Sequence, residues 1–135
     1  AVQSFYERRP AEQGFPAELL EFLRHSGAPA APEDLQLFER ILTEAQATAK
    51  TWDGRVVFVY LPTWERYRLP ELASKDRDNV LGIARRLKLH VMDMHEVFVT
   101  HPDPLSLFPF RRYAHYNEAG HKLVGEEVVR QSGKL

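Results

Sequence analysis

The sequence has 135 residues, no cysteine, and a formal charge of −1 from 18 Lys and Arg against 19 Asp and Glu. Its length suits one domain with its own core, and 44% hydrophobic and 27% charged residues are typical of a globular chain. The balanced charge argues against a general nucleic-acid binder, and the lack of cysteine excludes disulfides, thiolate metal sites and a cysteine nucleophile. No apolar run approaches the ~20 residues of a membrane span. Because the chain opens at Ala1 without Met, we expect a processed product or an excised fragment.

The first half of the chain predicts two helices and a strand. Residues 1–31 are the least periodic part, and within them we expect a short helix at 16–25 and a loop at 27–32. Apolar residues at spacings of three and four predict a longer helix at 32–49. The run from Arg55 to Pro62 then predicts a strand, and its continuous apolar residues favour burial on both faces.

The second half alternates predicted loops, helices and a strand. We expect a connecting loop at 63–75, a helix at 76–88 and a shorter strand at 89–94. Residues 95–114 are predicted to form a long connection, and long loops inside compact domains are often functional. A last helix is expected at 117–131, with Asn117 as its N-cap.

This order of elements predicts an α/β fold with a parallel sheet. Only two strands are evident, whereas sheets of this kind usually have about four to six. Two strands would leave apolar helix surface uncovered. The interpretation is therefore either a single α/β domain over 1–135 or the C-terminal part of a larger one, with 1–31 as a poorly periodic N-terminal segment.

The most specific local pattern is His-Tyr-Asn-Glu-Ala-Gly-His at 115–121. It places His115 on the loop that enters the last helix. In open α/β folds, ligands bind at loops near the carboxyl ends of strands, and a histidine there titrates near neutral pH. Asn117 would fix the loop by capping the helix, and Gly120 would let the first turn approach another backbone closely.

This block resembles the C-terminal block of the SGNH, or GDSL, hydrolase family, which typically reads Asp-x-x-His-x-Asn-x-x-Gly-His. The two strands and the helix between them occur in the family's order, and the run at 101–110 is similar to a loop of some bacterial members. The resemblance covers roughly residues 35–131. It implies a three-layer flavodoxin-like sheet and ester hydrolysis or acyl transfer by a Ser-His-Asp arrangement. His115 would then act as general base and later as acid, and His121 would be structural.

The resemblance further implies an exported or envelope-associated bacterial protein, an ester or acylated carbohydrate as substrate, and no cofactor. Two departures limit it. Arg112 stands three residues before His115, where the family has its acid. The tentative acid is Asp103, Asp93 is a second option, and a Ser-His dyad oriented by a backbone carbonyl is a third. No Gly-Asp-Ser and no Gly-x-Asn block occurs, so the nucleophile would lie upstream and this chain alone would be inert.

A different class of function is a non-catalytic α/β interaction module derived from such a fold, which would bind a protein or a carbohydrate. Self-association, or association with a missing N-terminal part, would cover open sheet edges.

No metal site is predicted, because the histidines lack the His-Glu-x-x-His spacing and strand alternation would place His90 and His95 on opposite faces of an extended segment. The basic pairs at 85–86 and 111–112 are too small for nucleic acid.

Overall fold

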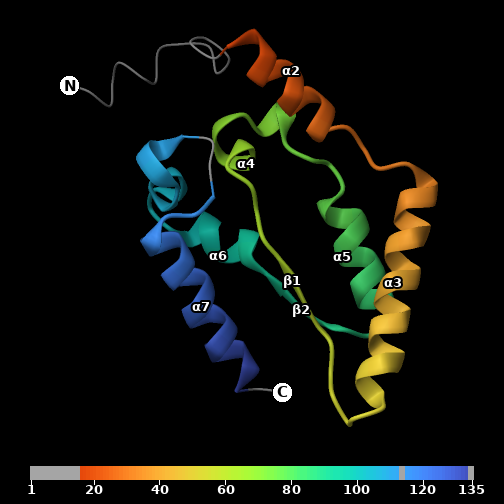
Figure 1. Ribbon diagram of the computed structural model, residues 1–135. Helices are drawn as coiled ribbons and strands as arrows, with labels where there is room; N and C mark the ends of the chain where they lie inside the picture. Colours follow the sequence, from red (N-terminus) through yellow and green to blue (C-terminus); the bar gives the residue numbers. More distant parts are fainter. Residues whose placement is uncertain (1–15, 113–114, 134–135) are drawn as a thin grey trace.

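The structure is a computed structural model that describes residues 16–112 and 115–133. The start of the poorly periodic segment, residues 1–15, lies outside the described part. The fold is mixed α/β, with a two-stranded parallel sheet between helices (Figure 1). Within the described ranges, every helix is too short or too polar to cross a lipid bilayer.

Two helices precede the sheet, as the sequence predicts. Helix α2 spans Ala17–Ser26 and helix α3 spans Pro32–Lys50. Pro32 occupies the first turn of α3 together with two acidic residues, which suits the positive end of the helix dipole. The apolar stripe of α3 faces the sheet, where Phe38 packs edge-on against Phe58 at 5.8 Å between ring centres.

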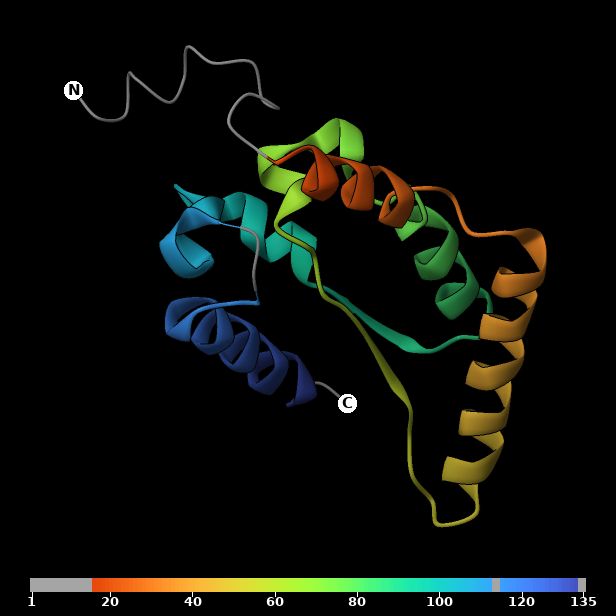
Figure 2. The same ribbon diagram turned by 45° about the horizontal axis from the view of Figure 1, so that its top comes forward.

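Strands β1 (Val57–Tyr60) and β2 (His90–Asp93) run parallel, with Val57 opposite His90 and Tyr60 opposite Asp93. Helix α5 (Arg77–Arg86) is the crossover between them. Helices α3 and α5 lie on one side of the sheet, and α6 (Met94–Thr100) and α7 (Glu118–Ser132) lie on the other (Figure 2). Both faces of β1 are therefore packed against helices, as its continuous apolar run predicts, although its residues stay half-buried.

Two of the expected loops contain helices, so those predictions are wrong in part. Residues 63–75 form helix α4 (Glu65–Arg68) and the 3₁₀ turn η1 (Pro70–Leu72). The connection expected at 95–114 begins inside helix α6 and continues through the 3₁₀ turns η2 (Pro104–Leu107) and η3 (Pro109–Arg111).

The expectation that His90 and His95 occupy one extended segment is also wrong. Strand β2 ends at Asp93, whose side chain accepts a hydrogen bond from the backbone N–H of His95 at 3.1 Å and so caps α6. His95 therefore lies in the first turn of a helix. Met92 and Met94 stand two residues apart, as apolar residues of a strand do, which favoured a strand that continues past the Asp93 cap.

The core lies under the carboxyl ends of the strands. It consists of seven buried side chains: Trp64, Leu69, Met92, Met94, Phe98, Leu107 and Phe108. Phe98 of α6 is at its centre, because its ring lies 5.0 Å from the ring of Tyr116, 6.0 Å from Tyr67 and 6.3 Å from Phe108. The core thus joins α6, the loop before α7 and the segment after β1.

Replacing Phe98 by Leu should destabilise the protein, because the side chain is 0% exposed and a smaller group leaves a void among the rings. We expect a loss of about 1–2 kcal/mol in the free energy of unfolding by urea. Val99 is the next residue of the same helix and is 49% exposed, so Val99→Ala should cost no more than about 0.5 kcal/mol. Equal losses in the two variants would contradict this placement of the core.

Candidate functional site

Polar side chains gather where both strands end. Tyr60 closes β1 and Asp93 closes β2, and the two residues face each other in register. This carboxyl edge is the position at which open α/β sheets bind ligands. Two groups of side chains occupy it. One is a charged cluster of Arg77, Asp93, His95 and Glu96, called here the carboxyl-edge cluster, and the other is the loop that carries His115.

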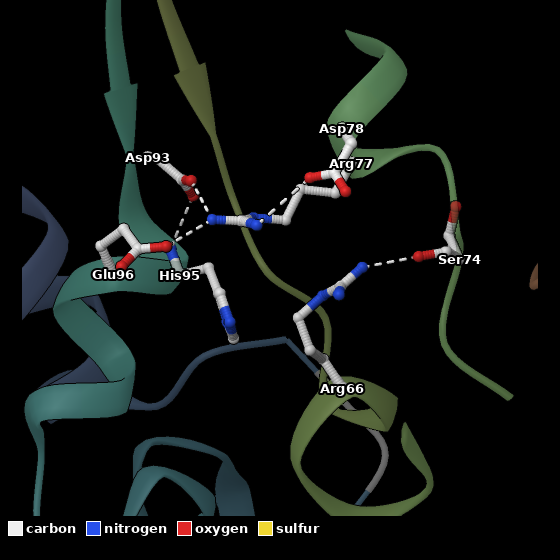
Figure 3. Close-up of polar contacts among 7 residues, drawn as sticks. All are labelled: Arg66, Ser74, Arg77, Asp78, Asp93, His95 and Glu96. Carbon is white, nitrogen blue, oxygen red and sulfur yellow. Dashed lines mark hydrogen bonds and ion pairs between the residues drawn. The ribbon is translucent and has the colours of Figure 1, made fainter. Parts of the chain in front are cut away.

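Arg77 connects α5 to the far end of β2 within this cluster (Figure 3). Its guanidinium donates to the carboxylates of Asp93 and Glu96, the latter at 2.5 Å. Burial by itself would lower the pKa of Arg77, but hydrogen bonds and charge from Asp93 and Glu96 raise it above its usual value. Since the Asp93 side chain is only 9% exposed, this ion pair is shielded from solvent.

His95 also has an altered pKa within this cluster. Burial lowers this pKa from 6.5, and the positive charges of Arg77 and Arg66 lower it further. Its Nδ1 lies 3.2 Å from the hydroxyl of Tyr67, and the two rings stack at 5.7 Å. Burial also raises the pKa of that tyrosine, which keeps its hydroxyl protonated. His95 is therefore a neutral imidazole held against a phenol at neutral pH.

Arg66 approaches the cluster from α4. Its Nη2 donates to the carbonyl oxygen of Ser74 at 2.6 Å, and its guanidinium carbon lies 5.9 Å from the centre of the Tyr60 ring. Arg77 lies at the same distance from this ring. The end of β1 is therefore flanked by two guanidinium groups, which stabilises Tyr60 through cation–π contacts.

The loop before α7 is anchored to the end of β1. The hydroxyl of Tyr116 donates to the carbonyl of Pro62 at 2.5 Å, and its ring lies 5.3 Å from that of Phe108. Burial raises the pKa of Tyr116, so this donor remains protonated. His115 precedes Tyr116 and is exposed. The structure thus places His115 on the loop entering the last helix, next to a residue fixed at the carboxyl edge.

Asn117 and Gly120 form the start of α7. The Asn117 Oδ1 accepts from the N–H of Gly120 at 3.0 Å, and its Nδ2 donates to the carbonyl of Ser106 at 2.7 Å. One side chain thus caps the helix and ties it to η2. Gly120 is buried, and a Cβ at this position would lie 2.6 Å from the carbonyl oxygen of Leu107. Glycine is therefore required by the close approach of α7 to η2.

The structure does not bring His115 together with an acid among the described residues. The carboxylate of Asp103 pairs with the guanidinium of Arg111, including a 2.9 Å contact from Nη2 to Oδ1. Asp93 is engaged by Arg77 and by the cap of α6. Ser106 directs its hydroxyl at the carbonyl of Asp103 at 2.7 Å. Of the described part of the chain, no set of three or more His, Asp or Glu side chains could hold a metal ion.

Comparison with known proteins found no matching family model, curated protein or solved structure. The chain's own residues therefore carry the functional argument. The sequence pointed to His115, Asn117 and Gly120. It did not predict that Arg77, His95 and Tyr67 lie together at the carboxyl edge. One pattern in the sequence could have indicated the start of α6. Asp93 is followed three residues later by Glu96, and this spacing resembles a capping box with an aspartate at the N-cap.

Gly120→Ala should destabilise the protein even though alanine favours helices, because the new Cβ would clash with η2. We expect a loss of about 1–3 kcal/mol in the free energy of unfolding. Gly125 in the same helix has nothing within 4 Å of a built Cβ, so Gly125→Ala should gain about 0.5–1 kcal/mol. Urea denaturation of both variants checks this, and a stabilising Gly120→Ala would show that α7 and η2 are not in close contact.

His95 should make the protein less stable as the solution becomes acidic. Its pKa is lower in the folded chain than its ordinary 6.5, so the unfolded chain binds more protons between these two values. The free energy of unfolding should therefore fall as pH drops from about 7.5 to 5.5, and His95→Gln should flatten this dependence. The same substitution at the exposed His25 is the control in urea denaturation. An equal flattening in both variants would contradict the shift.

Proposed function

We propose that this chain supplies the catalytic histidine, His115, of an SGNH/GDSL-type serine esterase or acyltransferase. The observation that carries the proposal is the position of His115. It is exposed, it belongs to a loop that Tyr116 ties to the end of β1, and it precedes a helix that Asn117 caps. A fixed loop with a free imidazole at the carboxyl edge is what a general base requires.

In this mechanism the imidazole of His115 accepts the proton of a serine hydroxyl while the serine oxygen attacks the ester carbonyl. The resulting imidazolium returns that proton to the leaving alkoxide, and an acyl-serine remains. The same histidine then deprotonates water for hydrolysis, or an acceptor hydroxyl for acyl transfer. The expected substrate is an ester such as an acylated carbohydrate.

The serine is proposed to come from a segment with a Gly-Asp-Ser block outside these 135 residues. Support comes from the sheet, because two parallel strands normally belong to a larger buried sheet. The proposed complete sheet is flavodoxin-like, with β1 and β2 as two of its strands. Leu61, just after β1, and Val129 on α7 are 50% and 73% exposed, which gives further strands and helices apolar surface to cover.

The proposed orienting group for the imidazole is a backbone carbonyl. Arg111 occupies the carboxylate of Asp103, and Arg77 occupies that of Asp93. Arg112 cannot take the acid's role because its guanidinium would repel the imidazolium. A Ser-His dyad is therefore the arrangement best supported by these contacts.

The second candidate is a non-catalytic α/β module that binds a protein or carbohydrate. The engagement of Asp93 and Asp103 by arginines also favours this candidate. Within residues 16–112 and 115–133, no carboxylate contacts His115. The two candidates differ in one measurable property, which is the presence of a serine activated by His115.

A fluorophosphonate probe, which reacts covalently with activated serines, tests this difference in the full-length gene product. We expect labelling of one serine outside these residues, slowed in His115→Ala by about 10²–10⁴-fold because the base is lost. His25→Ala, at an exposed position of α2, should label at nearly the parental rate.

Two results would contradict the proposal. If no serine reacts, or if His115→Ala reacts as fast as the parent, His115 is not a base and the module is favoured. The 135-residue chain alone should not turn over p-nitrophenyl acetate faster than its His115→Ala variant. Faster turnover would place the nucleophile within this chain.

A further inference from the structure

A cavity of about 280 Å³ opens at the opposite edge of the sheet, where both strands begin. It is lined by the first residues of β1 and β2 and by the C-terminal ends of α3 and α5. Its polar side chains are Gln46, Lys50, Arg55, Lys88 and His90. This amino-edge cavity is separate from the carboxyl edge, because β1 and β2 run parallel from one to the other.

The charges around the amino-edge cavity have a single sign. Lys50, Arg55 and Lys88 contribute cations, and none of the described residues that line the cavity carries a carboxylate. The whole chain has a formal charge of −1, so this local excess does not reflect a generally basic protein. The remaining lining is apolar and comes from Val56, Val57 and Leu89. A cationic rim over an apolar floor suits an anion with an apolar body.

Cations at helix C-termini often serve only to stabilise the helix dipole. Here the terminal carbonyls already accept backbone hydrogen bonds. The carbonyl of Ala49 accepts from the N–H of Gly54 at 2.8 Å. The carbonyl of Ala84 accepts from the N–H of Leu89 at 3.0 Å, and that of Arg85 accepts from the N–H of Lys88 at 2.9 Å. Lys50 and Lys88 are exposed, and neither forms an ion pair with another residue of the described ranges, so their ammonium groups can reach a ligand.

The backbone of Lys88 gives a second, independent observation. Its φ is 58°, in the left-handed region that favours glycine and disfavours a residue with a Cβ. A lysine at this position carries a conformational cost, and such a cost at a cavity wall points to a role for the side chain. His90 adds a third observation, because its Nε2 is buried without a hydrogen-bond partner.

We propose that the amino-edge cavity binds a small organic phosphate monoester. Lys50 and Lys88 donate charge-assisted hydrogen bonds to the phosphate oxygens, and the organic group lies against Val57 and Leu89. His90 provides a further donor at the wall of the cavity once its ring turns toward the ligand. This binding site is independent of the function proposed for His115.

Phenyl phosphate, titrated into the 135-residue chain at constant ionic strength and followed by amide NMR shifts, tests the proposal. We expect saturable shifts at residues 50–57 and 87–90. Lys50→Gln should weaken binding about tenfold or more, the expected effect of losing one charged contact. Lys75→Gln, which removes an exposed lysine near the other end of α5, should not change the affinity.

Lys88→Gly separates binding from folding. Glycine relieves the positive φ, so the urea midpoint should not fall, whereas the affinity for phenyl phosphate should drop about tenfold. Any one of three results would overturn the proposal. The first is the absence of saturable shifts up to about 10 mM phenyl phosphate. The second is an affinity of the Lys50 and Lys88 variants equal to that of the parent. The third is an affinity for inorganic phosphate as high as that for phenyl phosphate.

Discussion

The carboxylate of Asp93 holds the carboxyl edge together. It stands at the last position of β2, accepts from the backbone N–H of His95 to start α6, and pairs with Arg77 of α5. Three elements thus meet at one side chain that is almost fully shielded from solvent. Because a buried charge without its partner is strongly unfavourable, neither α5 nor α6 can shift alone without exposing or orphaning this group. The geometry of the whole edge follows from that constraint.

The two histidines at this edge differ because their surroundings differ. His95 lies inside the charged cluster, where burial and two arginines keep it neutral and Tyr67 holds its ring. The loop of His115 is instead fixed by neutral contacts of its neighbours, Tyr116 and Asn117. Such contacts position the backbone of the loop and leave the side chain of His115 exposed, whereas that of His95 is packed against Tyr67.

The elements with a clear apolar pattern were predictable, since α3 and α5 repeat apolar residues at helical spacing and β1 lies in a continuous apolar run. Asn117 and Gly120 were also readable, because capping and close backbone approach depend on local residue type. Helix α6 was missed because Met92 and Met94 have the two-residue spacing of a strand across its start. The pairing of Arg77 with Asp93 joins residues 16 positions apart, and no local pattern specifies it.

The two edges of the sheet differ in the charges of their side chains. At the carboxyl edge Arg77 pairs with Asp93 and Glu96, and Arg66 lies close by. Burial and the two arginines lower the pKa of His95 there against the opposing effect of the two carboxylates. At the amino edge, the charged side chains that line the cavity are all cationic among the residues that the structure describes. Four-residue strands span about 10 Å between their end residues, and this length separates the amino-edge cavity from the carboxyl edge. An anion bound there would act on the carboxyl edge only through the shared strands, whose register fixes the position of Asp93.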